Sequence, residues 1–417
     1  MNFLLTSNPA FLVIPAEDNE FIFYNSLQHR ASRLNYLEML ILDMYYTFQD
    51  KTYIIDQFNE DRRPVISEAL DKIDEHKLLV CEDIPDTMSS DPVFPSSYYL
   101  HLTYKCNLRC TYCYNKTIRK DKQSHLPLKE WMLIIDKIAP YVKTITLTGG
   151  EFFLYPDLLK LLKYVKHKCP DAVISAISNG MHDFWEGDFS EAFEYISSIS
   201  FSCDSISREG ERKGFDPELY RKNILWVKEA YPHVRISVAS TVTSSNLPDI
   251  KEISGFCQEH QFDLSRTMMN PENAKEVCLM PSMEDQMILS DSDIPANSTA
   301  RLKSASFRCG AGKSVCSIDP SGNIYPCQSL HYDEFLMGNL VRDSIKDLKY
   351  FGKKGFILKT VNEFPMCSKC KVKYICGGGC PATAYRFYGN RIGPNHLSCR
   401  MNYNNSIQQL KALNNRL

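Results

Sequence analysis

The feature that most constrains the fold of this chain is an alternation of strand-like and helix-like segments between residues 98 and 270. Runs rich in β-branched residues, such as TITLTGG and VRISVASTV, alternate with runs whose apolar residues recur every three to four positions. This order is typical of βα units around a parallel sheet. Six strand-like runs predict an α/β fold with a partial (βα)6 TIM-like barrel, whose reactive end is the C-terminal edge of the strands.

The segments on either side of this series have other patterns. Two short β-like runs, AFLVIPA and EFIFYNS, precede helical spacing over about 34–48 and 63–77, which predicts a small α+β module. Residues 83–97 are rich in Asp, Pro and Ser, as expected of a linker. The predicted domains are an N-terminal module (1–85), the barrel (98–270), a bridge (271–308) and a loop-rich C-terminal region (309–417).

Composition excludes some classes of partner. With 44% hydrophobic and 24% charged residues and a net charge of -2, the chain has no basic field that would gather nucleic acid or anionic membrane. The N-terminus shows no export signal, and the run LEMLILDMYY is shorter than the roughly 20 residues that span a bilayer. We therefore expect a cytoplasmic protein without nucleic-acid or membrane partners.

Sixteen cysteines in a long chain without an export signal indicate metal or cluster binding rather than disulfides. Three of them, Cys106, Cys110 and Cys113, have the spacing C-x3-C-x2-C directly after the first strand of the βα series. Four thiolates would fill every position of an iron–sulfur cubane, whereas three leave one iron open. The alternative is a zinc site that lacks its fourth ligand in this segment.

With Tyr112 before the third cysteine, this segment resembles the signature C-x3-C-x-aromatic-C of the radical S-adenosylmethionine (SAM) superfamily. The resemblance implies that Cys106, Cys110 and Cys113 bind a 4Fe–4S cluster whose open iron chelates SAM. It also implies that Tyr112 packs near the adenine. Reductive cleavage of SAM would then give a 5′-deoxyadenosyl radical that takes a hydrogen atom from the substrate.

The second strand of the series ends in Thr148, Gly149, Gly150 and Glu151. Alone, a Gly-Gly pair after a strand indicates only a turn. The superfamily uses a GGE motif at this place to bind the SAM amino group, so the resemblance implies that the Glu151 carboxylate accepts from the SAM ammonium. Phe152 stands where many members have Pro.

Four further polar residues lie at or near the ends of later strands: Asn179, Ser202, Asp204 and Arg266. The resemblance implies contacts with SAM or substrate at these positions, and Asp204 is a candidate base. The alternative for Ser202 and Asp204 is a capped turn between strand and helix, and for Arg266 an ordinary surface or core position.

Eight cysteines near the C-terminus resemble the SPASM domain that follows many radical SAM barrels. The resemblance implies two auxiliary 4Fe–4S clusters that accept electrons from the substrate. It assigns Cys309, Cys316, Cys327 and Cys380 to the first cluster, and Cys367, Cys370, Cys376 and Cys399 to the second. Many members lack a cysteine at the position of Cys316. A pair of zinc knuckles is the alternative for these spacings.

The N-terminal module resembles, by pattern, the winged-helix domain that recognises leader peptides in pathways for ribosomally made, modified peptides. Paired β runs are followed by a helix, and then by a helix running into a short strand. In that family the leader peptide adds as an extra strand to the sheet edge. A generic helical cap or a dimerisation arm is the alternative.

Together these resemblances predict a radical SAM peptide maturase that makes a thioether or carbon–carbon crosslink, an oxidation or an epimerisation. Its predicted partners are a precursor peptide with a leader segment and a reductant such as flavodoxin or ferredoxin. One alternative is an anaerobic, formylglycine-forming sulfatase-maturing enzyme. Another is a non-enzymatic, cysteine-rich zinc or electron-transfer protein.

Overall fold

The computed structural model describes most of the chain. The described residues are 3–80, 94–116, 125–185, 188–271, 274–282, 284–285, 309–348, 360–389 and 399–411, without 9, 17 and 29. They belong to two compact units. The first is Met1–Met88, Met283–Cys309 and Leu358–Leu417, and the second is Ser89–Ser282 and Gly310–Ile357. The C-terminal region is thus shared between the units, and most of the predicted bridge lies outside the described residues.

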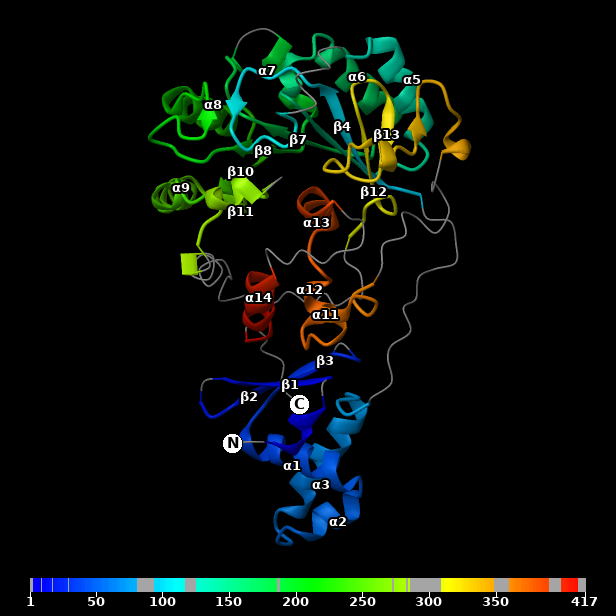
Figure 1. Ribbon diagram of the computed structural model, residues 1–417, viewed down its shortest axis with the longest axis vertical. Coiled ribbons are helices and arrows are strands. Elements are labelled where there is room, and N and C mark those ends of the chain that lie inside the picture. The colour runs from blue at the N-terminus through cyan, green and yellow to red at the C-terminus, as the bar shows by residue number, and fades with distance from the viewer. Residues whose placement is uncertain are drawn as a thin grey trace. The chain divides into compact units, whose positions relative to one another are not determined.

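The second unit contains a nine-stranded sheet in the order β11-β10-β8-β7-β6-β4-β12-β13-β14. The six strands of the βα series are parallel neighbours: β4 (Ser97–Thr103), β6 (Thr144–Gly149), β7 (Val173–Ser178), β8 (Ser198–Ser202), β10 (Arg235–Val242) and β11 (Asp263–Met268). Between them lie α5 (Leu128–Ile138), α6 (Leu158–Lys168), α7 (Asp188–Ala192), α8 (Pro217–Ala230) and α9 (Leu247–His260) (Figure 1). The predicted α/β fold is confirmed.

Local sequence explains why these segments fold as they do. Strand β10 alternates between buried and less buried positions, and helix α5 buries Trp131, Ile134 and Ile138 along one face. Helix α8 begins where the Asp216 carboxylate accepts from the backbone N–H groups of Glu218 and Leu219. The pattern of apolar residues therefore places each element with its buried side toward the core.

The sheet does not end at the barrel. Strand β12 (Val315–Ile318) pairs in parallel with β4, and β13 (Asn323–Tyr325) and β14 (Gly338–Asn339) continue the sheet antiparallel. A tight turn joins β12 to β13, in which Gly322 has a φ of 80° and donates to the Asp319 carbonyl. The sequence predicted only a loop-rich region here, so this extension is a finding of the structure.

The first unit begins with an antiparallel sheet of β1 (Phe11–Pro15), β2 (Phe21–Asn25) and β3 (Arg30–Leu34), called here the N-terminal sheet. It is followed by α1 (Tyr36–Phe48), α2 (Lys51–Asp56) and α3 (Arg63–Glu75). Asn35 and Glu38 form a capping box at the start of α1. Where a short strand is expected after α3, residues 76–79 form a turn, and the Asn25 side chain donates to the Leu78 and Val80 carbonyls.

The same unit contains α11 (Pro365–Ser368), α12 (Lys373–Cys376), α13 (Pro381–Tyr388) and α14 (Cys399–Lys411). The N-terminal sheet is buried on both faces, between α1–α3 on one side and α14 on the other (Figure 1).

The shorter elements of the molecule are η1 (Leu4–Ser7), β5 (Arg109–Cys110), η2 (Phe152–Leu154), η3 (Phe193–Tyr195), β9 (Arg212–Lys213), η4 (Ala274–Leu279), η5 (Asp333–Phe335) and η6 (Ile345–Asp347). In the described ranges no helix has both the length and the apolar character needed to cross a bilayer.

Candidate active site

The loop after β4, residues Cys106–Cys113, is called here the cysteine loop. Its three cysteines are half-buried. The Leu108 backbone N–H and the Asn179 side-chain amide donate to the Cys106 sulfur at 3.4 and 3.6 Å. Hydrogen bonds to ligand sulfurs are one means by which a protein adjusts the reduction potential of an iron–sulfur cluster. These donors therefore suit a sulfur that ligates a cluster.

Two glycines bring the end of β6 against residues 103–105, which lead from β4 into the cysteine loop. The Gly150 and Glu151 N–H groups donate to the Thr103 and Lys105 carbonyls, both at 2.8 Å. A Cβ atom on Gly149 would lie 2.3 Å from the Thr103 oxygen, and one on Gly150 would lie 2.1 Å from the Lys105 oxygen. Because no side chain fits in this space, glycine is required at both positions. The predicted Thr148–Glu151 motif thus lies next to the predicted cluster ligands.

Glu151 is buried at this junction. Its carboxylate accepts from the Asn179 N–H at 2.8 Å and from the Ser178 hydroxyl at 3.1 Å. Burial raises the pKa of Glu151 to about 7, although these hydrogen bonds lower it. A buried carboxyl group of this kind gains from a cationic ligand that stabilises its charged form. The site is therefore suited to bind an ammonium group.

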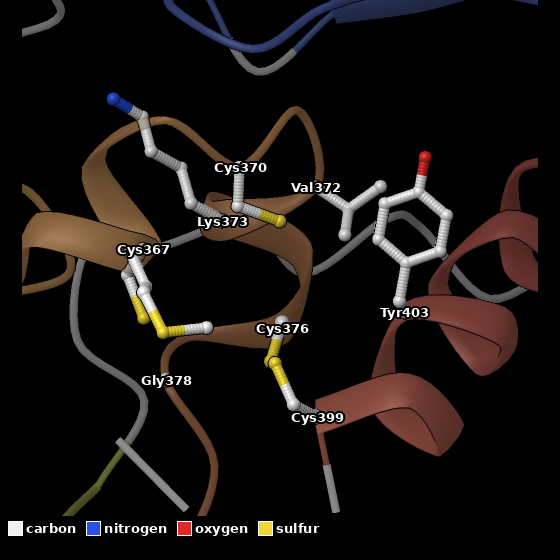
Figure 2. A pocket seen from close by; sticks show the side chains of 9 residues that line it. Cys367, Cys370, Val372, Lys373, Cys376, Gly378, Cys399 and Tyr403 are labelled. Atoms are coloured by element: carbon white, nitrogen blue, oxygen red, sulfur yellow. The ribbon is translucent and has the colours of Figure 1, made fainter. Parts of the chain in front are cut away.

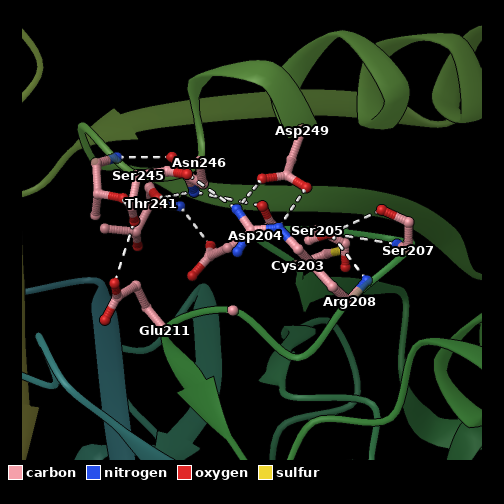
Figure 3. A network of polar contacts seen from close by, with 12 residues as sticks. Cys203, Asp204, Ser205, Ser207, Arg208, Glu211, Thr241, Ser245, Asn246 and Asp249 are labelled. Carbon is pink, nitrogen blue, oxygen red and sulfur yellow. Dashed lines mark hydrogen bonds and ion pairs between the residues drawn. The ribbon is translucent and has the colours of Figure 1, made fainter.

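Asp204 follows β8 and belongs to a buried polar network (Figure 3). Its carboxylate forms an ion pair with Arg212 at 3.0 Å and accepts from the Thr241 N–H at 2.9 Å. Burial raises the pKa of Asp204, and Arg212 acts in the opposite direction. Arg212 therefore makes Asp204 a weaker proton acceptor than burial alone would make it. The Asn246 amide joins the network by donating to the Asp204 carbonyl.

Arg212 is a site residue that the sequence analysis missed. Its side chain is 10% exposed, and its Nη1 donates to the Cys110 sulfur at 3.9 Å. Its guanidinium also lies over the Tyr112 ring at 5.7 Å. Strands β5 and β9 pair so that Cys110 is opposite Arg212. The segment SREGERKG is polar enough to predict a surface turn, so no local signal reveals this pairing.

The remaining predicted residues of this region lie on separate elements. Asn179 contacts both Glu151 and the Asn107 side chain, whose oxygen accepts from it at 2.7 Å. Ser202 is the half-buried last residue of β8. Arg266 is half-buried on the outer strand β11, and burial lowers its pKa. The structure thus connects Cys106, Glu151 and Asn179 directly, and places Ser202 and Arg266 on two strands of the same sheet.

Cys367, Cys370, Cys376 and Cys399 line one pocket of about 200 Å³ in the first unit, called here the cysteine pocket. Figure 2 shows Cys376 on α12 and Cys399 on α14 pointing toward one another. Burial raises the pKa of Cys367 to about 11 and also raises that of Cys370 and Cys376. Metal binding to these thiols would therefore release protons.

As placed, no three Cys, His, Asp or Glu side chains of the described residues already form a coordination group. The other four cysteines assigned to a cluster lie in both units. Cys316 is fully buried on β12 opposite Tyr98, and Cys327 is half-buried after β13. Cys309 and Cys380 belong to the first unit, and Cys380 is exposed.

Comparison with known proteins identifies the chemistry of this arrangement. Residues 100–252 match the radical SAM superfamily, and residues 309–371 match an iron–sulfur cluster-binding domain, SPASM. The chain carries a radical SAM domain followed by a SPASM domain. It is therefore an enzyme, with SAM, a SAM-binding 4Fe–4S cluster and auxiliary iron–sulfur clusters as its cofactors. The prediction of a radical SAM enzyme is confirmed, and the non-enzymatic alternative is wrong.

Relatives and solved structures agree with this assignment. Mycofactocin maturase MftC of Mycobacterium ulcerans is 24% identical over 307 residues, which cover 68% of this chain and 82% of the relative. Streptococcus suis SuiB bound to SAM has a TM-score of 0.56 at 16% identity and covers 94% of this chain and 99% of its own. The protein anSMEcpe with bound AdoMet has a TM-score of 0.56 at 15% identity, covering 76% and 98%. Both structural likenesses show the fold.

Proposed function

We propose that this radical SAM enzyme is a maturase that modifies a ribosomally made precursor peptide. The observation that carries the proposal is the N-terminal sheet with α1–α3, a module of the kind that binds peptides by strand addition. SuiB, whose fold match covers 94% of this chain, has also been solved with its precursor peptide SuiA. MftC is a mycofactocin maturase. The match to anSMEcpe covers a smaller part of the chain, 76%.

The donor sets suit the cofactors. We assign Cys106, Cys110 and Cys113 to the SAM-binding cluster, which supplies the electron that cleaves SAM when it is bound. Glu151 is assigned to the SAM ammonium, because it is a buried carboxyl group whose charged form a cationic partner would stabilise. The other residues assigned to SAM are Tyr112, Thr148, Gly149, Gly150, Asn179, Ser202 and Arg266.

Asn179 has a central place in this assignment. Its side chain donates to the Cys106 sulfur, and its backbone N–H donates to the Glu151 carboxylate. One residue therefore orients both a cluster ligand and the ammonium acceptor. For Asp204, the ion pair with Arg212 favours a positioning role at the cysteine loop over proton transfer.

The auxiliary clusters are assigned to two sets of cysteines. Cys309, Cys316, Cys327 and Cys380 form the first set, and the cysteine pocket forms the second. Four thiols around one pocket suit a closed metal or cluster site. We also propose a reducing cytoplasm as the location, where thiols stay available as cluster ligands, and flavodoxin or ferredoxin as the reductant.

Coexpression of the full chain with a short peptide encoded beside its gene tests the proposal. Mass spectrometry should show a modified peptide, and anaerobic assays should show 5′-deoxyadenosine. The Cys106→Ala variant should lose both, whereas Cys169→Ala, at the buried C-terminal end of α6, should keep both. An unmodified peptide together with formylglycine formation in a sulfatase-derived peptide would instead establish the alternative enzyme.

A further inference from the structure

The back face of the N-terminal sheet, the face turned away from α1–α3, packs on the C-terminal end of the chain. Ile14, Ile22 and Tyr24 form one apolar cluster with Ile375 and Leu410. Leu12, Ala16, Ala31 and Ile407 are partly buried around it. Because side chains alternate along a strand, this set is distinct from Phe11 and Phe23, which face α1–α3. The sheet therefore needs both covers to bury its apolar surface.

The residues of the second cover are neighbours of the cysteine pocket in the sequence. Ile375 directly precedes Cys376 in α12. Helix α14 begins at Cys399, and Cys399, Tyr403, Ile407 and Leu410 follow the spacing of one helix face. Cys399 and Tyr403 line the pocket (Figure 2). Ile407 and Leu410 contact the sheet cluster. One stripe of α14 thus connects the pocket to the sheet over about 16 Å of helix.

Helix α14 is not stable through its own sequence. It has thirteen residues, including three asparagines, and its only buried side chains among those described are Ser406 and Leu410. Isolated helices of this length are marginal in water, and asparagine is a poor helix former. The helix therefore depends on contacts at both ends: the pocket at Cys399 and the sheet at Leu410.

We propose that the cluster or metal held in the cysteine pocket acts as a structural clasp for the N-terminal sheet. Occupancy of the pocket holds α12 and α14 in place, and these elements cover the back face of the sheet. Precursor-peptide binding then depends on the pocket being filled, irrespective of the redox state of the cluster. This last step rests on the proposed function, because it takes the sheet as the peptide-binding element.

Hydrogen–deuterium exchange of the full-length, anaerobically reconstituted enzyme without peptide tests the clasp. Cys399→Ser should lose metal and raise exchange in β1–β3 at least about tenfold, because the sheet opens more often. Cys278→Ser, which changes an exposed thiol on η4, should leave exchange unchanged. Full metal content in Cys399→Ser, or lost metal with unchanged exchange, would overturn the clasp. A difference in the exchange of β1–β3 between oxidised and reduced wild-type enzyme would also overturn the clasp.

The coupling is reciprocal, so a change at the sheet should weaken the pocket. Leu410→Ala keeps every cysteine, and in equilibrium competition with a chelator it should bind the pocket metal about tenfold less tightly than wild type. Leu4→Ala, at a leucine that is 62% exposed in the same unit, is the matched control and should bind the metal with wild-type affinity. Equal affinities for the two variants would contradict the proposal.

A labelled precursor peptide, the one modified in coexpression, tests the functional consequence. Fluorescence anisotropy should show binding about tenfold weaker for Cys399→Ser than for Cys278→Ser. If Cys399→Ser exchanges faster in the sheet but binds the peptide with unchanged affinity, the sheet is not the peptide-binding element, and the proposed dependence of peptide binding on the pocket is wrong. The exchange experiment contains no peptide, so its result stands even if the enzyme acts on another substrate.

Discussion

Among single residues, Glu151 is the one whose role depends most directly on pH. Its pKa is raised to about 7 by burial, so the carboxyl group becomes charged as the pH rises through neutrality. The SAM ammonium requires the charged form as its acceptor. Affinity for SAM should therefore be half-maximal near pH 7, approach its maximum about one pH unit above that, and fall about tenfold per pH unit well below it, because only the ionised fraction binds. Calorimetric titration of the reconstituted enzyme at several pH values measures this.

The control for this prediction is Glu151→Gln, which removes the titrating group. That variant should bind SAM weakly at every pH, with a flat profile. A pH profile that survives the substitution would assign the titration to another group.

The buried pair of Asp204 and Arg212 should be strongly coupled. Arg212→Gln leaves a buried carboxylate without its partner, which costs about 3–5 kcal/mol. The double variant Asp204→Asn with Arg212→Gln should lose much less free energy of unfolding than the sum of the losses of the two single variants. Arg235→Gln breaks an ion pair whose side chains are 77% and 58% exposed, and should cost at most about 1 kcal/mol. Urea denaturation of the apo-protein measures the free energy of unfolding of each variant. Equal decreases for Arg212→Gln and Arg235→Gln would refute the coupling.

At the scale of elements, the junction between β6 and the cysteine loop should be sensitive to one methyl group. Gly150→Ala places a Cβ atom 2.1 Å from the Lys105 carbonyl oxygen, so the two segments must separate. We expect less iron per chain and little 5′-deoxyadenosine. Gly255→Ala on α9 meets nothing within 4 Å and should raise the free energy of unfolding by up to about 1 kcal/mol. Iron analysis and SAM cleavage assays check both variants, and normal activity in Gly150→Ala would contradict the packing argument.

Elements that rest on local patterns could be predicted, whereas those that rest on long-range pairing could not. The six parallel strands follow from alternating runs. The two cysteine sets come from the resemblance to the SPASM domain and stay a prediction. Strands β5 and β9 have two residues each and bring together Cys110 and Arg212, which are 102 positions apart. Nothing near Arg212 in the sequence indicates that partner. Strands β12–β14 were missed for the same reason, because β12 pairs with the distant β4, and β13 and β14 continue the sheet from β12.

At the scale of the molecule, removal of residues 1–85 should damage more than peptide recognition. The deletion exposes Ile375, Ile407 and Leu410, which the N-terminal sheet buries or partly buries. We expect the truncated chain to contain less iron per chain, while the radical SAM domain, in the other unit, still cleaves SAM without peptide. Iron analysis and 5′-deoxyadenosine measurement test this. Full iron content in the truncated chain would show that the contact between the N-terminal sheet and α14 is not needed to hold the metal.

Strand β4 has β6 on one side and β12 on the other, so its backbone hydrogen bonds join the βα series to the strands of the C-terminal region. It leads into Cys106, while its neighbour β12 contains Cys316 and is followed through β13 by Cys327. Cys106 and Cys316 thus belong to neighbouring strands of one sheet, within one unit. In the assignment proposed above, Cys106 and Cys316 ligate different clusters, and the backbone pairing of β4 with β12 then sets the tunnelling distance between these two sulfurs. Substrate binding would change the driving force for electron transfer between them rather than the path length.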